Sequence, residues 1–417
     1  MQSGLSARDA ALRILATVGR QPTLRVPLDT ALGSVLAESV VSPIDVPFRT
    51  NSAMDGYAAR ADDVRGATAE RPVRLTVVER IPAGAVPAVT IGPGQAARIF
   101  TGAPLPAGAD SVIRQEDTDY GDPVVTIVKD RDCGVNFRRA GEDLRAGALA
   151  LAAGTELEAA HLGVLASLAV AHPVVFRRPR VGILGSGDEI VGIDRPDEIL
   201  SGRKTASSNT HTLRALIRRA GGEPVDLGLA ADSVESLRRH LEAGGDCDLL
   251  VTTAGISVGE HDHLRSAIES MGGRLDLWKL RMRPGAPVGF GTVLGIPWIG
   301  LPGNPVSTMV TFELFARPAI RGMMGHAQPF RRAVPVTLTE PVAVGPKLQH
   351  FLRAIVSEAE PLPEVRLTGP QGSGILTSMV LANALLILPE GRHAAGPGDR
   401  LDAIRLDDPR HQAEPPF

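Results

Sequence analysis

The chain has 417 residues, with 45 Gly, 33 Pro and 43% hydrophobic residues. So many helix breakers among so many apolar residues exclude a single helical bundle and predict a folded chain of two to four domains. The net charge of −3 and the two distant cysteines, Cys133 and Cys247, argue against a nucleic-acid-binding surface, a disulfide framework and a structural zinc site. The apolar runs are too short to cross a bilayer and we see no signal-peptide pattern, so we expect a cytoplasmic protein without membrane or nucleic-acid partners.

The first 178 residues combine helical and β-like patterns. Residues 6–18 have the apolar spacing of an amphipathic helix capped by Ser6, and residues 158–170 predict a second helix. Between them, short β-like runs separated by Gly and Pro predict a small β unit. We expect a helical linking unit formed by residues 1–45 together with 142–178, and a β-rich unit over residues 46–141.

From residue 180 onwards, strand and helix patterns alternate at βαβ spacing. This alternation predicts a doubly wound, mostly parallel α/β domain over residues 179–328. The predicted helices are 209–220, 233–243, 261–271 and 305–323, and the predicted strands are near 181–187, 224–229, 248–255, 275–282 and 297–301. Residues 329–417 return to β-like runs and predict a C-terminal β-barrel or sandwich, so the fold class is multidomain α/β.

Three loops follow strands of the expected α/β domain, and ligands bind at the carboxyl ends of such strands. The first, residues 184–190, combines small residues with Asp188 and Glu189. Small residues let a ligand approach the backbone, and carboxylates beside a phosphate typically hold magnesium or orient water. A tight turn with exposed acids is the alternative.

The second loop, residues 252–263, contains four consecutive acids and histidines. Successive helical residues diverge by about 100°, so these side chains cannot all meet at one metal ion, and exposed histidines are favoured. The third loop, residues 300–315, places Asn304 as an N-cap before Pro305, where free amides and the helix dipole would attract an anion. A well-capped helix is the alternative, but three such loops at one sheet edge together favour anion binding.

A basic segment and an unusual turn complete the candidate sites. Lys279, Arg281 and Arg283 alternate in a predicted strand and would share one face, which favours binding of an anionic substrate over a solvated edge strand. Only four of the basic residues are lysines, and Lys279 is one of them. The segment FRTNSAMDGYA, residues 48–58, predicts a turn with special backbone angles, but its composition assigns no role.

Seven motifs occur in one order: NSAMDGYA, IFTGAPLPAGAD, RRAGEDLRAG, GSGDE, SVGEHD, WKLRMRPG and GLPGNPVS. With them the chain resembles the family of MoeA and the gephyrin E domain, the molybdopterin molybdenumtransferases, from about residue 5 to residue 405. The resemblance implies that the protein inserts molybdate into adenylylated molybdopterin with Mg²⁺ and releases AMP. It also implies an elongated homodimer of four-unit subunits, with the third unit similar to molybdopterin adenylyltransferases (MoaB-like) and an active site between that unit and the partner subunit. A molybdopterin adenylyltransferase and recipient molybdoenzymes are the further partners that it implies.

The resemblance also implies roles for individual residues. The expected catalytic groups are Thr101, Glu189, Asp232, Asp262, Lys279 and Arg283, with Glu189 and Asp262 as the magnesium ligands. The expected substrate-binding residues are Ser186, Gly187, Ser257, Gly259, Pro302, Gly303, Asn304, Arg353 and Ser373.

The chain departs from the family pattern at four places. Thr50 stands where the family has Asp, Ala286 replaces a lysine, and Thr253-Ala254-Gly255 replaces Ser-Gly-Gly. Arg283 replaces the second family lysine but keeps a cation that can bind an oxyanion. These departures leave a non-catalytic binding or scaffold protein as one alternative. A molybdopterin adenylyltransferase is the other, although that activity resides in single-domain proteins.

Overall fold

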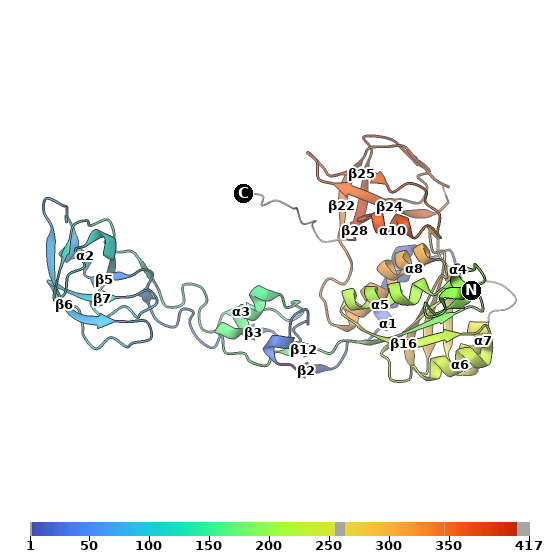
Figure 1. Cartoon of the computed structure of the whole chain (residues 1–417), viewed down its shortest axis with the longest axis horizontal. Coiled ribbons are helices and arrows are strands. Elements are labelled where there is room, and N and C mark those ends of the chain that lie inside the picture. Colours follow the sequence, from blue (N-terminus) through green and yellow to red (C-terminus); the bar gives the residue numbers. More distant parts are fainter. Residues whose placement is uncertain (1, 255–262, 346, 407–417) are drawn as a thin grey trace.

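The computed structural model describes residues 2–254, 263–345 and 347–406. The molecule is elongated, with a β unit at one end, a narrow linking region in the middle, and an α/β unit with a β-barrel at the other end (Figure 1). In the described residues, no helix is long and apolar enough to cross a membrane.

The distal unit is a five-stranded sheet in the order β8-β5-β7-β6-β9. It has an apolar core on each side, because its strands alternate between two sets of buried side chains. Its strands are β5 (Gly56–Ala59), β6 (Val73–Ile81), β7 (Gln95–Ile99), β8 (Ser111–Arg114) and β9 (Val124–Ile127), with the short helix α2 (Ala61–Val64). At its base, β4 (Asn51–Ser52) pairs with β10 (Phe137–Arg138).

The linking region is built where the chain leaves for the distal unit and returns from it. Outgoing strands pair with returning ones: β2 (Thr23–Arg25) with β12 (Val174–Phe176), and β3 (Val40–Val41) with β11 (Leu149–Leu151). Two-stranded pairs are marginal alone, so the small core beneath α3 (Ala159–Ser167) and η1 (Leu28–Thr30) supplies their stability. The predicted helix at 158–170 is confirmed in a shorter form.

The central sheet has the order β1-β18-β20-β21-β17-β13-β16. Its strands are β1 (Gln2–Ser3), β13 (Arg180–Ser186), β16 (Glu223–Ala230), β17 (Leu249–Thr253), β18 (Arg274–Lys279), β20 (Pro287–Val293) and β21 (Ile296–Leu301). The expected parallel arrangement is confirmed for β13, β16, β17 and β21. The strand β20 was not expected, and it runs antiparallel to both neighbours.

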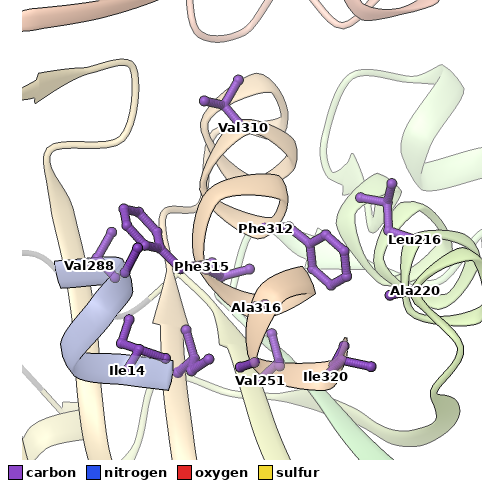
Figure 2. Close-up of a cluster of buried hydrophobic side chains, with 14 of the residues drawn as sticks. Ile14, Leu216, Ala220, Val251, Val288, Val310, Phe312, Phe315, Ala316 and Ile320 are labelled. Atoms are coloured by element: carbon purple, nitrogen blue, oxygen red, sulfur yellow. The ribbon is translucent and has the colours of Figure 1, made fainter. Parts of the chain in front are cut away.

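Helices cover both faces of this sheet. On one face lie α1 (Ala7–Thr17), α5 (Ser208–Ala220) and the helix formed by α8 (Pro305–Thr311), the π-helical turn η3 (Phe312–Ala316) and α9 (Arg317–Met323). On the other lie α6 (Val234–Glu242) and α7 (His263–Ser270). Figure 2 shows Phe312 and Phe315 packed between Leu216, Ile14 and the strand residue Val251. Fully burying each such side chain contributes about 1.5–3 kcal/mol.

The C-terminal region is a closed five-stranded barrel, because β24 also pairs with β26. Its strands are β22 (Ala333–Leu338), β24 (Gln349–Ser357), β25 (Glu364–Leu367), β26 (Ala384–Leu388) and β28 (Arg400–Arg405). Beside them lie the helix α10 (Thr377–Leu381) and the pair β23 (Val342–Ala343) and β27 (Ala394–Ala395). The strand β19 (Met282–Arg283) leaves the central unit and pairs with β24, so the barrel lies against the α/β unit (Figure 1).

Candidate functional site

A cavity of about 390 Å³ opens at the carboxyl ends of β13, β17 and β21. Four residues expected from the sequence line this cavity: Ser186 and Glu189 in the first loop, and Gly303 and Asn304 in the third. Its remaining wall comes from the start of α5 and from β14 (Ile190–Val191) and β15 (Thr205–Ala206), which lead into and out of α4 (Pro196–Leu200).

The first loop folds the Glu189 carboxylate back over the backbone of Gly187. Gly187 has a φ of +135°, and a Cβ there would lie 2.8 Å from Glu189 Oε2. Only glycine permits both the backbone angle and this close approach. Asp232, which follows β16, is brought to the same loop, because its amide donates to Asp188 Oδ1 at 3.1 Å and its Oδ2 accepts from the Asp188 amide at 3.4 Å.

The second and third loops touch each other. Ala254 ends the described part of the second loop with a φ of +73°, and a Cβ on Gly303 would lie 3.2 Å from the Ala254 Cβ. Asn209 joins the two loops through side-chain hydrogen bonds to Thr253 and Gly303. The expected site residues Ser257, Gly259 and Asp262 lie outside the described residues.

Asn304 occupies the expected N-cap position of α8, but its side chain does not cap the helix. Its Nδ2 donates instead to Ser373 Oγ at 3.2 Å, and the Val306 amide donates to the Ser373 carbonyl at 3.1 Å. A loop of the barrel therefore completes the start of this helix. Asn304 and Ser373, far apart in the sequence, meet at one place, and one of the amides expected to face an anion is already occupied.

Two further cavities adjoin the first. One of about 290 Å³ is lined by Asn304, Pro302, Ser373 and Arg283, and it shares Asn304 with the first cavity. The other, of about 530 Å³, lies in the barrel and shares Arg283 with the second. The three cavities thus form a tract from the edge of the central sheet to the barrel, with Arg283 between the second and the third.

Arg353 lies against this tract but is fully buried. Its Nε donates to Ser378 Oγ at 3.0 Å, and its two terminal nitrogens donate to the carbonyls of Gln371 at 3.1 Å and Gly372 at 2.9 Å. Burial lowers the pKa of this guanidinium below its ordinary value. The geometry makes Arg353 a clamp on the loop that presents Ser373.

The expected strand over residues 275–282 is wrong as a single element. It splits because β18 ends at Lys279 in the central sheet, whereas β19 begins at Met282 and belongs to the barrel sheet. The expected alternation nevertheless persists across the break: Leu280 and Met282 are buried, while Lys279 and Arg283 are exposed.

Arg281 is less available to a ligand than the pattern suggested. Its Nε forms an ion pair with Glu390 at 3.0 Å, and one terminal nitrogen donates to the carbonyl of Gly4. Lys279 lines none of the three cavities. Of the expected cationic stripe, only Arg283 faces the tract.

The three motifs of the distal unit, NSAMDGYA, IFTGAPLPAGAD and RRAGEDLRAG, contact one another. The Ser52 amide donates to the Ala103 carbonyl at 2.9 Å, and the Ala53 amide donates to the Asn136 carbonyl at 2.8 Å. The Thr50 hydroxyl accepts from the Ala140 amide at 3.2 Å, so this residue binds one motif to another.

Within this cluster, Thr101 holds Asp55. Both the amide and the hydroxyl of Thr101 donate to Asp55 Oδ1 at 2.8 Å, and these hydrogen bonds hold the pKa of Asp55 below its ordinary value. Sequence reasoning gave Asp55 no role, although it lies in the turn that the pattern singled out. The sequence feature that could have pointed to Asp55 is the Asp-Gly pair of that turn.

Three family models match the chain in succession. They are the MoeA N-terminal region (domain I and II) over residues 5–169, a probable molybdopterin binding domain over 182–322, and the MoeA C-terminal region (domain IV) over 335–406. A molybdopterin molybdenumtransferase of Nostoc sp. is 36% identical, with 96% of this chain and 94% of that protein aligned. The chain belongs to the MoeA family.

Further relatives support this membership. Molybdopterin molybdenumtransferase 2 of Mycobacterium tuberculosis is 38% identical over 92% of this chain and 95% of its own length. The crystal structure of the molybdopterin biosynthesis MoeA protein from Pyrococcus horikoshii OT3 superposes with a TM-score of 0.80 at 28% identity, covering 96% of this chain and all of that one.

The MoeA fold of this chain separates its candidate residues into two groups. Glu189, Asn304, Arg283 and Ser373 lie along the tract between the central sheet and the barrel. Thr101 follows β7 in the distal unit, at the opposite end of the molecule (Figure 1). One chain alone therefore does not bring Thr101 to the tract.

Proposed function

We propose that the protein is a molybdopterin molybdenumtransferase that takes adenylylated molybdopterin and molybdate as substrates and releases AMP. The observation that carries this proposal is the tract of three adjoining cavities, in which Glu189, Asn304, Arg283 and Ser373 come together from the central sheet and the barrel. The relatives named as molybdopterin molybdenumtransferases align with nearly the whole chain, which supports the same activity.

The described side chains suit hydrolysis of a phosphoanhydride. Small residues at the first and third loops leave room for phosphate oxygens close to the backbone, and Arg283 supplies a cation where charge develops on the leaving phosphate or on molybdate. Asn304 and Ser373 offer neutral donors where the 390 Å³ cavity meets the 290 Å³ cavity. In this proposal Arg353 and Gly187 act by holding the groups that contact the substrate.

Magnesium fits the donors of the cavity. Mg²⁺ prefers one or two carboxylates, with phosphate oxygens and water as its other ligands. Glu189 provides a carboxylate in the cavity wall, and the described residues contain no group of three or more His, Cys, Asp or Glu that would form a complete protein cage. We propose Glu189 and Asp262 as its ligands, and when bound the ion would neutralise phosphate charge.

We further propose a homodimer in which the distal unit of one subunit completes the site of the other. The support is the separation of Thr101 and Asp55 from the tract in an elongated chain (Figure 1).

The proposed division of the chain has four units, 1–45 with 142–178, 46–141, 179–328 and 329–417. The exception is α1, which belongs to the central unit because it packs in that core. A cytoplasmic location, supply by a molybdopterin adenylyltransferase and transfer to molybdoenzymes belong to the same proposal.

One observation keeps a non-catalytic binding protein as a second candidate. Ala286 lines the 290 Å³ cavity, so Arg283 is the only lysine or arginine among the described residues that line it. A binding protein would hold the substrates without turnover, and the measurement of turnover separates the two candidates.

The test compares Glu189→Gln with a matched carboxylate far from the cavities. Glu242→Gln removes an exposed ion pair with Arg238 at the end of α6. With adenylylated molybdopterin, molybdate and Mg²⁺, we expect Glu189→Gln to slow AMP release by about 100-fold or more, as when one preorganised electrostatic group is lost. The Glu242→Gln variant should release AMP at the wild-type rate. Equal rates in both variants would contradict the role of Glu189.

A further inference from the structure

Asn209 binds together three separate segments at the main cavity. It is the second residue of α5 and lines the cavity. Its Nδ2 donates to Thr253 Oγ1 at 2.7 Å, at the end of β17, and to the Gly303 carbonyl at 2.7 Å, in the loop after β21. The two hydrogens of one amide nitrogen therefore hold two of the three ligand-facing loops.

The partners of Asn209 fix the orientation of its amide. The Gly303 carbonyl can only accept a hydrogen bond, so the amide nitrogen and not its oxygen must face Gly303. The second hydrogen of that nitrogen then points at Thr253 Oγ1, which must accept it. A threonine hydroxyl that accepts from one side still has its own hydrogen to donate.

That hydrogen of Thr253 has no acceptor among the described side chains and carbonyls. Thr253 is 3% exposed and lines the cavity, and within the described residues its side chain makes the hydrogen bond that it accepts from Asn209 and no other. The neighbouring Thr252 accepts from the Trp298 indole at 3.1 Å. A buried hydroxyl hydrogen without an acceptor carries a desolvation cost that a ligand oxygen would remove.

We propose that Asn209 is a positioning residue that turns the Thr253 hydroxyl hydrogen into the cavity, where it binds an anionic oxygen of a phosphate ester. A hydrogen bond accepted by a hydroxyl polarises it and strengthens the bond that it donates. The same side chain keeps the loops of Ala254 and Gly303 in contact. The inference rests on the proposed function for the identity of the ligand, whereas the geometry stands without it.

The first arm of the test measures AMP binding by calorimetry to the full-length protein. Thr253→Val keeps the shape and removes the hydroxyl, and Asn209→Leu keeps the size and removes both donors. Each single variant should bind AMP about tenfold more weakly, the loss of one good hydrogen bond. Thr253→Ser should restore wild-type affinity. Ser6→Ala removes a polar group from the start of a remote helix, α1, and serves as the control that leaves AMP affinity unchanged.

The double variant distinguishes a relay from two independent contacts. If Asn209 acts through Thr253, Asn209→Leu with Thr253→Val binds AMP about tenfold more weakly than wild type, like either single variant. A hundredfold loss would overturn the relay, and so would single variants that bind within twofold of wild type. If Asn209→Leu does not fold, Thr253→Val against Thr253→Ser still decides whether the hydroxyl binds the ligand.

The second arm needs no ligand. Hydrogen exchange of the free protein should become at least tenfold faster at amides of residues 300–306 in Asn209→Leu and stay unchanged there in Thr253→Val. Unchanged exchange in Asn209→Leu would overturn the role of Asn209 in holding the loop. If the wild-type protein binds no AMP but the two variants show this exchange pattern, the result would count against the proposed function and the ligand. Asn209 would remain as the residue that joins the loops.

Discussion

A steric constraint between two loops of the candidate site lies between two small residues, Ala254 and Gly303. Ala254 adopts a φ of +73°, a backbone region that L-residues occupy at a cost, and a Cβ added at Gly303 would lie 3.2 Å from the Ala254 Cβ, a tight contact that requires a neighbour to shift. The sequence pattern showed both as small loop residues. It did not show that each determines what the other can be, because that depends on contact between loops of two neighbouring strands.

This contact predicts a suppressor mutation. Gly303→Ala places a Cβ at 3.2 Å from the Ala254 Cβ, and we expect the resulting overpacking to destabilise the protein by about 1–3 kcal/mol. Ala254→Gly removes that atom, so the double variant should recover most of the loss. Denaturant unfolding of the three variants measures it. Equal destabilisation of the single Gly303→Ala and the double variant would show that the two loops are not in contact.

At the scale of elements, the loops are held by groups from outside the strands that carry them. Arg353 in β24 holds the loop of Ser373, and the Ser373 carbonyl in turn caps α8. The planar guanidinium suits this role because its donors are fixed in a fork. Arg353 thereby determines the geometry of Ser373, which we propose as a substrate-binding residue.

Replacing Arg353 tests this clamp. Arg353→Met leaves the carbonyls of Gln371 and Gly372 without their donor, and we expect a destabilisation of about 3 kcal/mol together with slower AMP release. Arg353→Lys keeps the charge but not the fork and should rescue little of either effect. Thermal unfolding and the AMP-release rate are the measurements. Full activity in Arg353→Lys would indicate that charge alone matters at this position.

The junction between α9 and the linking region depends on a neutral histidine. Burial, together with the Arg321 guanidinium, lowers the pKa of His326 to about 4. Arg321 also binds Glu156 of the linking region at 3.0 Å, and its guanidinium donates to His326 Nδ1 at 3.0 Å. Protonated His326 could no longer accept that hydrogen bond, and its positive charge would lie beside the Arg321 guanidinium.

The pH dependence follows from this shift. Between pH 6.5 and pH 4 the unfolded chain binds a proton at His326 that the folded chain does not, so stability is greatest above pH 6.5 and falls as the pH drops towards 4. His326→Gln should reduce the fall in the unfolding midpoint between pH 7 and pH 4.5 by roughly 2–4 °C. An identical fall in both proteins would contradict this assignment.

Much of this organisation could be predicted from the sequence. The strands β13, β17 and β21 were predictable because each combines a buried apolar run with a small-residue loop. The strand β20 was missed because its Pro- and Gly-rich surroundings read as turn, and its place depends on pairing with two neighbours. The Asn304–Ser373 contact and the ion pair of Arg281 were not predictable, because both join the central unit to the barrel across a long stretch of sequence.

At the scale of the whole molecule, the distal unit and the tract lie at opposite ends of the chain (Figure 1). The distal unit carries Thr101 and Asp55 away from the cavities of its own chain, so we propose that it serves the tract of a second copy. Two-fold symmetry would make the arrangement reciprocal, so that each dimer holds two complete sites.

Mixed dimers test this arrangement. Thr101→Ala and Glu189→Gln should each be nearly inactive, but in a two-fold dimer of both variants one site contains neither substitution. Co-expression at equal levels should therefore recover about a quarter of wild-type AMP release, because half of the dimers are mixed and each has one intact site. Activity no greater than that of the separate variants would place Thr101 and Glu189 in the same subunit's site or in unrelated roles.

The most direct measurement of the central claim is AMP release by the wild-type protein from adenylylated molybdopterin with Mg²⁺, with and without molybdate, and with tungstate in its place. The account predicts that molybdate makes AMP appear together with a metal-containing pterin able to activate a molybdoenzyme that lacks its cofactor. AMP at the level of a protein-free blank, with the substrate bound but unchanged, would contradict it.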